Sequence, residues 1–185
     1  MKTLASSQSG YSLVELAITV AVLSVLIVAG LKGVQSILLS NEINEQVRKI
    51  AKTRARFASY FLGNPSSTVG YFLGSVSRSG QNSAFGTNEE ALYNSVAIGD
   101  YPTGTTFVYK VFNVPQAACA DFANGVAGLL YAMHIKPAGS VYPVNWATET
   151  SVVKAPGAAD VNTPALASLC DANTPAFDFY MALSR

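Results

Sequence analysis

The chain has 185 residues, of which 50% are hydrophobic and only 12% are charged, about half the charged fraction of an ordinary soluble domain. Its formal net charge of +1 excludes a global electrostatic field that would attract nucleic acid or an acidic partner. Such a composition fits a protein that packs against copies of itself or resides in a membrane. The length suits one hydrophobic segment followed by one globular domain.

Residues 1–10 form a short polar leader whose single charge is Lys2. A secretory signal would carry its cleavage site after the apolar run, at small residues, and no such site follows closely here. We therefore interpret the leader as a segment that is removed ahead of the apolar run. An uncleaved signal anchor is the alternative. By the positive-inside rule, Lys2 indicates a cytoplasmic N-terminus.

The most informative stretch covers residues 11–39, because its centre, residues 16–31, holds no charge, no amide and no proline. As a helix, that centre is about 24 Å long, which approaches the thickness of a bilayer's hydrocarbon core. A helix that is apolar on every side suits a membrane or the core of an assembly. One carboxylate, Glu15, stands at its start, where a charge is costly and usually functional.

The residues around this carboxylate, Gly10-Tyr11-Ser12-Leu13-Val14-Glu15-Leu16, resemble the type III signal of type IV prepilins and pseudopilins. The resemblance implies that prepilin peptidase cleaves between Gly10 and Tyr11 and methylates the new amine of Tyr11. It also implies that Glu15 serves assembly, since the ammonium of Tyr11 in a neighbouring subunit would neutralise it in a dry filament core. From the residues alone, the helix dipole and a wet interface are an alternative explanation of Glu15.

Residues 40–62 are predicted to continue the helix with an amphipathic pattern. The apolar residues at intervals of three and four are Ile37, Ile43, Val47, Ile50, Phe57 and Phe61. Five of the twelve basic residues fall between Arg48 and Arg56. We interpret them as a solvated helix face that pairs with acidic groups of a neighbouring subunit. Nucleic acid is not expected as a direct ligand, because no aromatic side chains are interleaved for base stacking.

Residues 63–185 are predicted to form a globular head domain, in which an antiparallel sheet lies across the long helix in an α+β arrangement. The helix stop is Gly63-Asn64-Pro65, and residues 66–90 read as a long surface loop. Strands are expected over residues 91–94, 96–98, 105–114, 141–144, 151–154 and 176–183. Helices are expected over residues 115–133 and 164–170.

The two cysteines, Cys119 and Cys170, are 51 positions apart, which is not a metal-ligand spacing. Outside the cytoplasm they would meet an oxidising compartment, so we expect a disulfide that stabilises the fold by roughly 3–4.7 kcal/mol. Two buried free thiols are the alternative. The region from Phe112 onward is similar to the disulfide-bounded region of type IVb pilins, of the toxin-coregulated and conjugative thin-pilus kind. The leader departs from that subclass, whose leaders are usually longer.

The sequence predicts no enzyme, no cofactor and no metal site. No nucleophile, phosphate-binding, zinc or calcium motif occurs. The only histidine, His134, is expected at the end of an apolar helix, where it suits the helix terminus. Trp146 is expected to be a buried anchor, with an exposed adhesive contact as the alternative.

The resemblance as a whole implies the type IV pilin fold: a long N-terminal helix, its hydrophobic half protruding, packed under an antiparallel sheet. It implies a major pilin, which is stored in the bacterial inner membrane and then extracted by the inner-membrane assembly machinery into a helical surface filament. One alternative is a minor pilin or type II secretion pseudopilin that primes a filament. Another is a signal-anchored binding module of the cell envelope. Adhesion, aggregation, motility, DNA uptake and conjugation are all compatible with the sequence.

Overall fold

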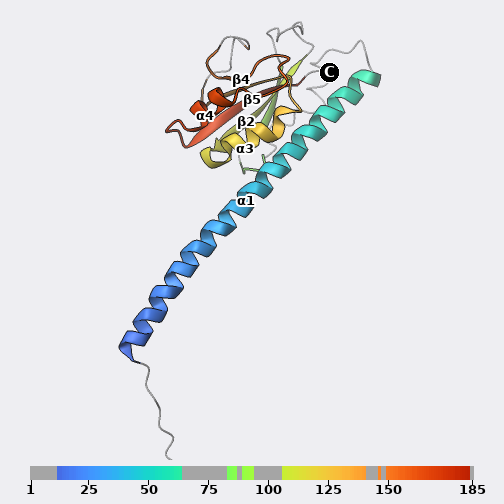
Figure 1. Ribbon diagram of the computed structural model, residues 1–185. Coiled ribbons are helices and arrows are strands. Elements are labelled where there is room, and N and C mark those ends of the chain that lie inside the picture. Colours follow the sequence, from blue (N-terminus) through green and yellow to red (C-terminus); the bar gives the residue numbers. More distant parts are fainter. Residues whose placement is uncertain are drawn as a thin grey trace, which may run out of the picture. The chain divides into compact units, whose positions relative to one another are not determined.

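The computed structural model describes residues 12–63, 83–86, 89–93, 106–140, 146 and 149–183. The chain divides into two compact units, Met1–Leu39 and Ser40–Arg185, and each is described by itself. The longest element, helix α1 (Leu13–Gly63), has its first part in one unit and its second part in the other (Figure 1). The helix ends at Gly63, the glycine that the sequence predicts as its stop.

In the first unit, the large hydrophobic side chains of α1 between residues 13 and 38 are all at least 54% exposed. The two hydroxyls between residues 16 and 31 bond within the helix: Thr19 donates to the carbonyl of Leu16 and Ser24 to that of Ala21, at 2.8 and 2.7 Å. These hydroxyls are satisfied without water, as a hydrocarbon surrounding requires. By length and composition alone, one helix in the described part of the chain is long and apolar enough to cross a membrane.

The second unit contains a five-stranded antiparallel sheet in the order β1-β2-β5-β3-β4. The strands are β1 (Glu89–Tyr93), β2 (Phe107–Pro115), β3 (Ala132–Pro137), β4 (Val152–Lys154) and β5 (Ala176–Leu183). The other elements are a 3₁₀ turn, η1 (Gln116–Ala118), and the helices α3 (Cys119–Ala127) and α4 (Thr163–Cys170). The C-terminal strand β5 is central, because it pairs with β2 on one side and with β3 on the other.

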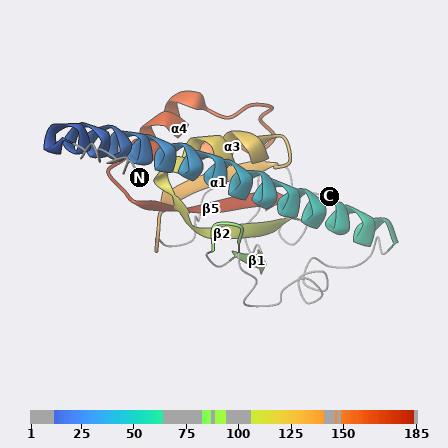
Figure 2. The ribbon, with the colours of Figure 1, turned by 90° about the horizontal axis from the view of Figure 1, so that it is seen from below.

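Two helices cover one face of this sheet, as Figure 2 shows. Phe57 of α1 packs on Phe107 of β2 with ring centroids 4.5 Å apart, and Phe122 of α3 packs on Phe179 of β5 at 4.9 Å. The two helices lie against each other: a Cβ built on Gly125 would come within 3.2 Å of a Val47 methyl. This aromatic layer is the main core of the head.

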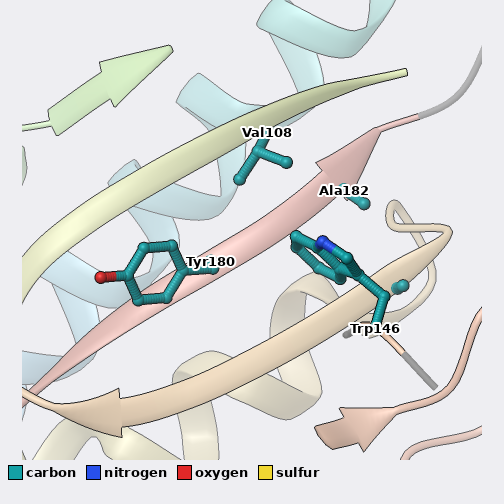
Figure 3. Packing of buried hydrophobic residues seen from close by; sticks show 5 residues of the cluster. Val108, Trp146, Tyr180 and Ala182 are labelled. Atoms are coloured by element: carbon teal, nitrogen blue, oxygen red, sulfur yellow. The ribbon is translucent and has the colours of Figure 1, made fainter. Parts of the chain in front are cut away.

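The opposite face of the sheet is covered by a smaller cluster, shown in Figure 3. Its buried members are Val108, Ala132, Trp146, Tyr180 and Ala182. Trp146 is only 2% exposed, so the expectation of a buried anchor is confirmed and the adhesive alternative is wrong. The second face therefore also excludes water, although it carries more polar side chains than the first.

Most predicted elements are confirmed within the described residues. The closing strand has the predicted bounds, and the predictions for β2, β4 and α4 each agree to within two residues. The first predicted strand is present as β1, two residues earlier at its start. The predicted strands over residues 96–98 and 141–144, and most of the predicted loop over residues 66–90, lie outside the described residues.

One predicted helix is wrong in its second half. The helix expected over residues 115–133 ends at Ala127, with Gly128 as its C-cap, and strand β3 begins at Ala132. His134 therefore lies in a strand next to β5, where it pairs in register with Tyr180, and not at a helix end. The apolar spacing of this segment fits both periods, and pairing with a strand some fifty residues later decides between them.

Candidate assembly site and the polar networks of the head

Glu15 lies in the first turn of α1, and its backbone N–H donates to the carbonyl of Ser12 at 3.0 Å. The hydroxyl of Ser12 accepts from the N–H of Val14 at 3.3 Å, so Ser12 acts as the N-cap of the helix. Ser12 and Glu15 have the spacing of a capping box, a signal that the sequence analysis did not use. Gly10 and Tyr11 lie outside the described residues.

The helix itself offers Glu15 no cation close by. Between residues 12 and 39 the sequence contains one basic residue, Lys32, which stands about 25 Å further along the helix axis. The helix dipole favours a carboxylate in the first turn, but by well under the cost of moving a charge into a dry environment. In an apolar surrounding, Glu15 therefore needs a positive partner from outside residues 12–39.

A disulfide joins Cys119 at the start of α3 to Cys170 at the end of α4, with their Cα atoms 5.7 Å apart. The expected disulfide is thus confirmed, and the alternative of two free thiols is wrong. The amide of Gln116 donates to the carbonyls of Cys170 and Ala172, both at 3.2 Å, so hydrogen bonds support the same junction. The disulfide connects the segment after β2 to the segment before β5.

On the second face of the sheet, Lys110 forms an ion pair with Asp178 at 3.0 Å. The ammonium also lies over two aromatic rings, 4.0 Å from the centroid of Phe112 and 4.6 Å from that of Tyr180. Burial acts to lower the pKa of Lys110, but hydrogen bonds with Tyr180 and Asp178 and the charge of Asp178 together outweigh it and raise this pKa. Lys110 is held charged in a mostly apolar setting.

A second network on this face centres on His134, which is fully buried. Its Nδ1 lies 3.0 Å from the hydroxyl of Ser151, which in turn donates to Glu149 at 3.3 Å, and Glu149 pairs with Lys136 at 2.7 Å. Because Ser151 donates to the carboxylate, its oxygen accepts from the histidine, which places the imidazole proton on Nδ1. The histidine ring packs edge-on against Trp146, with centroids 4.6 Å apart.

This histidine, serine and glutamate sequence does not have the arrangement of a nucleophilic triad. The serine hydroxyl points its proton at the carboxylate and not at the imidazole, and the histidine has no exposed surface. Burial lowers the pKa of His134 to about 4, although the charge of Glu149 acts to raise it, so the ring is neutral at physiological pH. The geometry supports a structural role for these residues.

A third network joins α1 to the sheet edge and was missed by sequence reasoning. The buried amide of Gln46 donates to Glu89 of β1 at 2.8 Å and accepts from the N–H of Ala84 at 2.7 Å. Tyr109, on the neighbouring strand β2, has its pKa raised by burial, by the charge of Glu89 and by a hydrogen bond to it. Gln46 lies on the buried side of the helix. A polar residue within the apolar repeat was the sequence signal that could have indicated this network.

The comparisons with known proteins agree with the N-terminal geometry. The prokaryotic N-terminal methylation motif matches residues 5–31, which include Glu15 and the first part of α1. Among solved structures, the chain is similar to the crystal structure of TcpA, a type IV pilin from Vibrio cholerae El Tor biotype. The identity is 16% and the TM-score 0.49, over 78% of this chain and 99% of that one. No curated protein sequence matches the chain.

The methylation motif of residues 5–31 continues into the apolar helix α1, and a disulfide-bonded sheet domain follows that helix. The resemblance drawn from residues 10–16 is thereby confirmed, and so is the α+β fold class.

Proposed function

We propose that this protein is the main repeating subunit of a bacterial type IV pilus. Prepilin peptidase would cleave between Gly10 and Tyr11, and Tyr11 would carry the new, methylated amine. Residues 11–39 would hold the chain in the inner membrane until the assembly machinery moves it into a helical filament at the cell surface. The single observation that carries this proposal is the methylation motif that runs directly into a helix of exposed apolar side chains.

The energetics of such assembly differ from those of a soluble interface. Moving an apolar helix from lipid to protein gains little by the hydrophobic effect, so van der Waals packing and polar pairing must set the register. Glu15 is the acidic residue of the apolar segment, and the amine of Tyr11 in a neighbouring subunit supplies the partner that its own helix lacks. Removing one member of such a buried pair typically costs about 3–5 kcal/mol.

The proposal is tested by the intact mass of the protein in filaments sheared from the cell surface, measured with and without reduction. We expect the mass of residues 11–185 plus one methyl group, rising by two hydrogen atoms on reduction. An unprocessed chain, or none in the sheared fraction, would leave an anchored envelope protein. The amount of the protein relative to other filament components distinguishes a major from a minor subunit.

The role of Glu15 is tested separately with Glu15→Gln and Glu15→Asp. The amide keeps the size of the side chain but removes the charge, so we expect filaments to fall at least about tenfold, as loss of a buried ion pair requires. The aspartate keeps the charge and should retain part of the assembly. Wild-type amounts of filament from Glu15→Gln would show that the pairing model is wrong.

A further inference from the structure

Two sets of exposed charges in the second unit have opposite signs. On α1, Arg48, Lys52 and Arg56 are all exposed and follow one another at intervals of four residues. Residues at this spacing form one ridge of a helix, about 6 Å apart, and this ridge faces away from the buried side chains of Ile50 and Phe57. We call these three residues the cationic ridge.

The cationic ridge has no ion pair within the described part of the chain. The three ion pairs found there are formed by Lys49 with Glu45, Lys110 with Asp178 and Lys136 with Glu149. Lys154, the remaining buried lysine, donates to the carbonyl of Ala127. These contacts involve the buried and half-buried lysines of the described residues, and none of them involves the cationic ridge.

Three exposed carboxylates lie outside α1: Asp121, Asp160 and Asp171. Asp121 is two residues after Cys119, and Asp171 directly follows Cys170, so the disulfide holds their two helices together. Asp160 lies in the loop ahead of α4, where its charge opposes the lowering of the pKa of Lys154 that burial causes. We call these three residues the acidic surface, and none of them forms an ion pair with another described residue.

We propose that the cationic ridge of one copy of this chain binds the acidic surface of the next copy. The two surfaces are different patches of one molecule, so the contact is heterologous, and a heterologous contact that does not close into a ring repeats as an open helical array. Each copy inside the array then has both of its surfaces neutralised. The inference rests on the proposed filament and identifies which part of the head orders neighbouring subunits within it.

Opposite charges on the two surfaces argue for a second copy over a polyanion such as DNA. A nucleic-acid site would leave the acidic surface without a role and would repel it from the phosphates. The ridge is also a single row of charges, with no exposed aromatic side chain between residues 44 and 59 on which a base would stack. The test nevertheless includes nucleic acid as an outcome.

The proposal predicts that two assembly-defective variants restore each other. In the first full-length chain the ridge is reversed (Arg48→Glu, Lys52→Glu and Arg56→Glu); in the second the acidic surface is reversed (Asp121→Lys, Asp160→Lys and Asp171→Lys). Expressed alone, each chain opposes like charges at every contact, and we expect sheared filaments to fall at least about tenfold. Expressed together, the two chains present only opposite charges when they alternate, so we expect at least about half of the wild-type amount.

Co-expression separates pairing between copies from damage to the fold, because each chain carries only one of the two reversals. The matched control is the double variant Arg48→Lys and Arg56→Lys, which changes the same positions of the ridge and keeps their positive charge. This control should assemble as the wild type does.

Three results would overturn the proposal. The first is wild-type assembly of either reversed chain alone, and the second is failure of the co-expressed pair. The third is unchanged filament from the ridge-reversed chain together with loss of retention on immobilised duplex DNA, which would assign the ridge to nucleic acid. In all three, wild-type filaments remain and only this inference fails. Absence of the wild-type chain from the sheared fraction would instead overturn the proposed function and this inference with it.

Discussion

Asp178 of β5 fixes the backbone at two places where the sheet departs from regular geometry. Its Oδ1 accepts from the N–H of Asn113, and its Oδ2 accepts from that of Gly139, both at 3.1 Å. Asn113 has φ 51° within the irregular part of β2, and Gly139 has φ 81° in the turn after β3. With Lys110 as its ion-pair partner, this one carboxylate connects β2, β5 and the end of β3.

Asp178→Ala is therefore expected to destabilise the fold by about 3–5 kcal/mol, because it leaves the buried ammonium of Lys110 and two backbone N–H groups without their acceptor. Lys110→Met should cost clearly less, since the methionine fills the space beside Phe112 and Tyr180 and Asp178 keeps its two backbone donors. Urea unfolding of the full chain in detergent micelles measures both. Equal costs for the two variants would show that the carboxylate acts only through the ion pair.

Helices and strands were largely predictable from the sequence where a local pattern of apolar residues specifies them. Strand β5 alternates buried side chains between two covered faces, and α1 has an uncharged, mostly apolar centre over residues 16–31, so both were predicted to within three residues. The boundary between α3 and β3 was not predicted. The apolar residues of this segment suit a helix face and a strand equally well, and only the register with β5 places Met133 and His134 on opposite faces of a sheet.

The site shows the same division. Glu15 can be named as a candidate because a charge in an apolar run stands out in the sequence alone. Gln46 and Glu89 are 43 residues apart, and Lys110 and Asp178 come from strands whose pairing no local pattern reveals. Partners at such distances are set by the sheet topology, so single-sequence reasoning finds the charged residues without finding their pairs.

Because His134 is buried, we expect the free energy of unfolding to decrease in mild acid. Burial lowers its pKa from 6.5 to about 4, so between these values the unfolded chain binds a proton that the folded chain does not. The stability from this residue is complete above about pH 6.5 and falls as the pH drops toward 4, by up to about 1.4 kcal/mol per pH unit. Nearby, the charge of Glu149 opposes this shift and that of Lys136 adds to it.

His134→Gln, which retains a side-chain donor for Ser151, should remove this part of the pH dependence. Melting temperatures of the full chain in detergent between pH 4.5 and 7.5 measure it, and carboxylates that titrate near pH 4 contribute equally to both proteins. If the wild type and the variant lose stability in parallel between about pH 6.5 and 5, His134 is not the group responsible.

Gln46→Glu tests the network between α1 and the sheet edge. The new carboxylate still accepts from the N–H of Ala84 but faces Glu89, which the amide of Gln46 now contacts at 2.8 Å. Two adjacent buried carboxylates share a proton, which raises the pKa of one of them. Folded protein then binds more protons than unfolded protein, so the variant should be least stable at pH 7.5 and recover as the pH falls toward 5.

Gln46→Met is the matched control for this experiment. It removes both hydrogen bonds without adding a charge, so it should lose about 1–3 kcal/mol with no recovery between pH 7.5 and 5. Melting curves of both variants at the two pH values distinguish the effects. A loss for Gln46→Glu that does not depend on pH would show that Glu89 is not its electrostatic partner.

The disulfide is expected to matter twice, for stability and for assembly. It closes a loop across 51 positions, and in the chain-entropy model its removal costs about 4 kcal/mol. The double variant Cys119→Ser and Cys170→Ser should therefore unfold at clearly lower urea concentration than the wild type. Gln116→Ala removes only the hydrogen bonds to the carbonyls of Cys170 and Ala172 and should cost less.

Because Asp121 and Asp171 stand on the two helices that the disulfide joins, its loss should also reduce sheared filaments under conditions where the head remains folded. Low-temperature growth provides those conditions, and a melting curve of the membrane-extracted chain verifies them. The Gln116→Ala variant, with the disulfide intact, should assemble normally. If the serine variant, once folded, forms filaments in wild-type amounts, the disulfide contributes to stability alone, and the acidic surface does not depend on it.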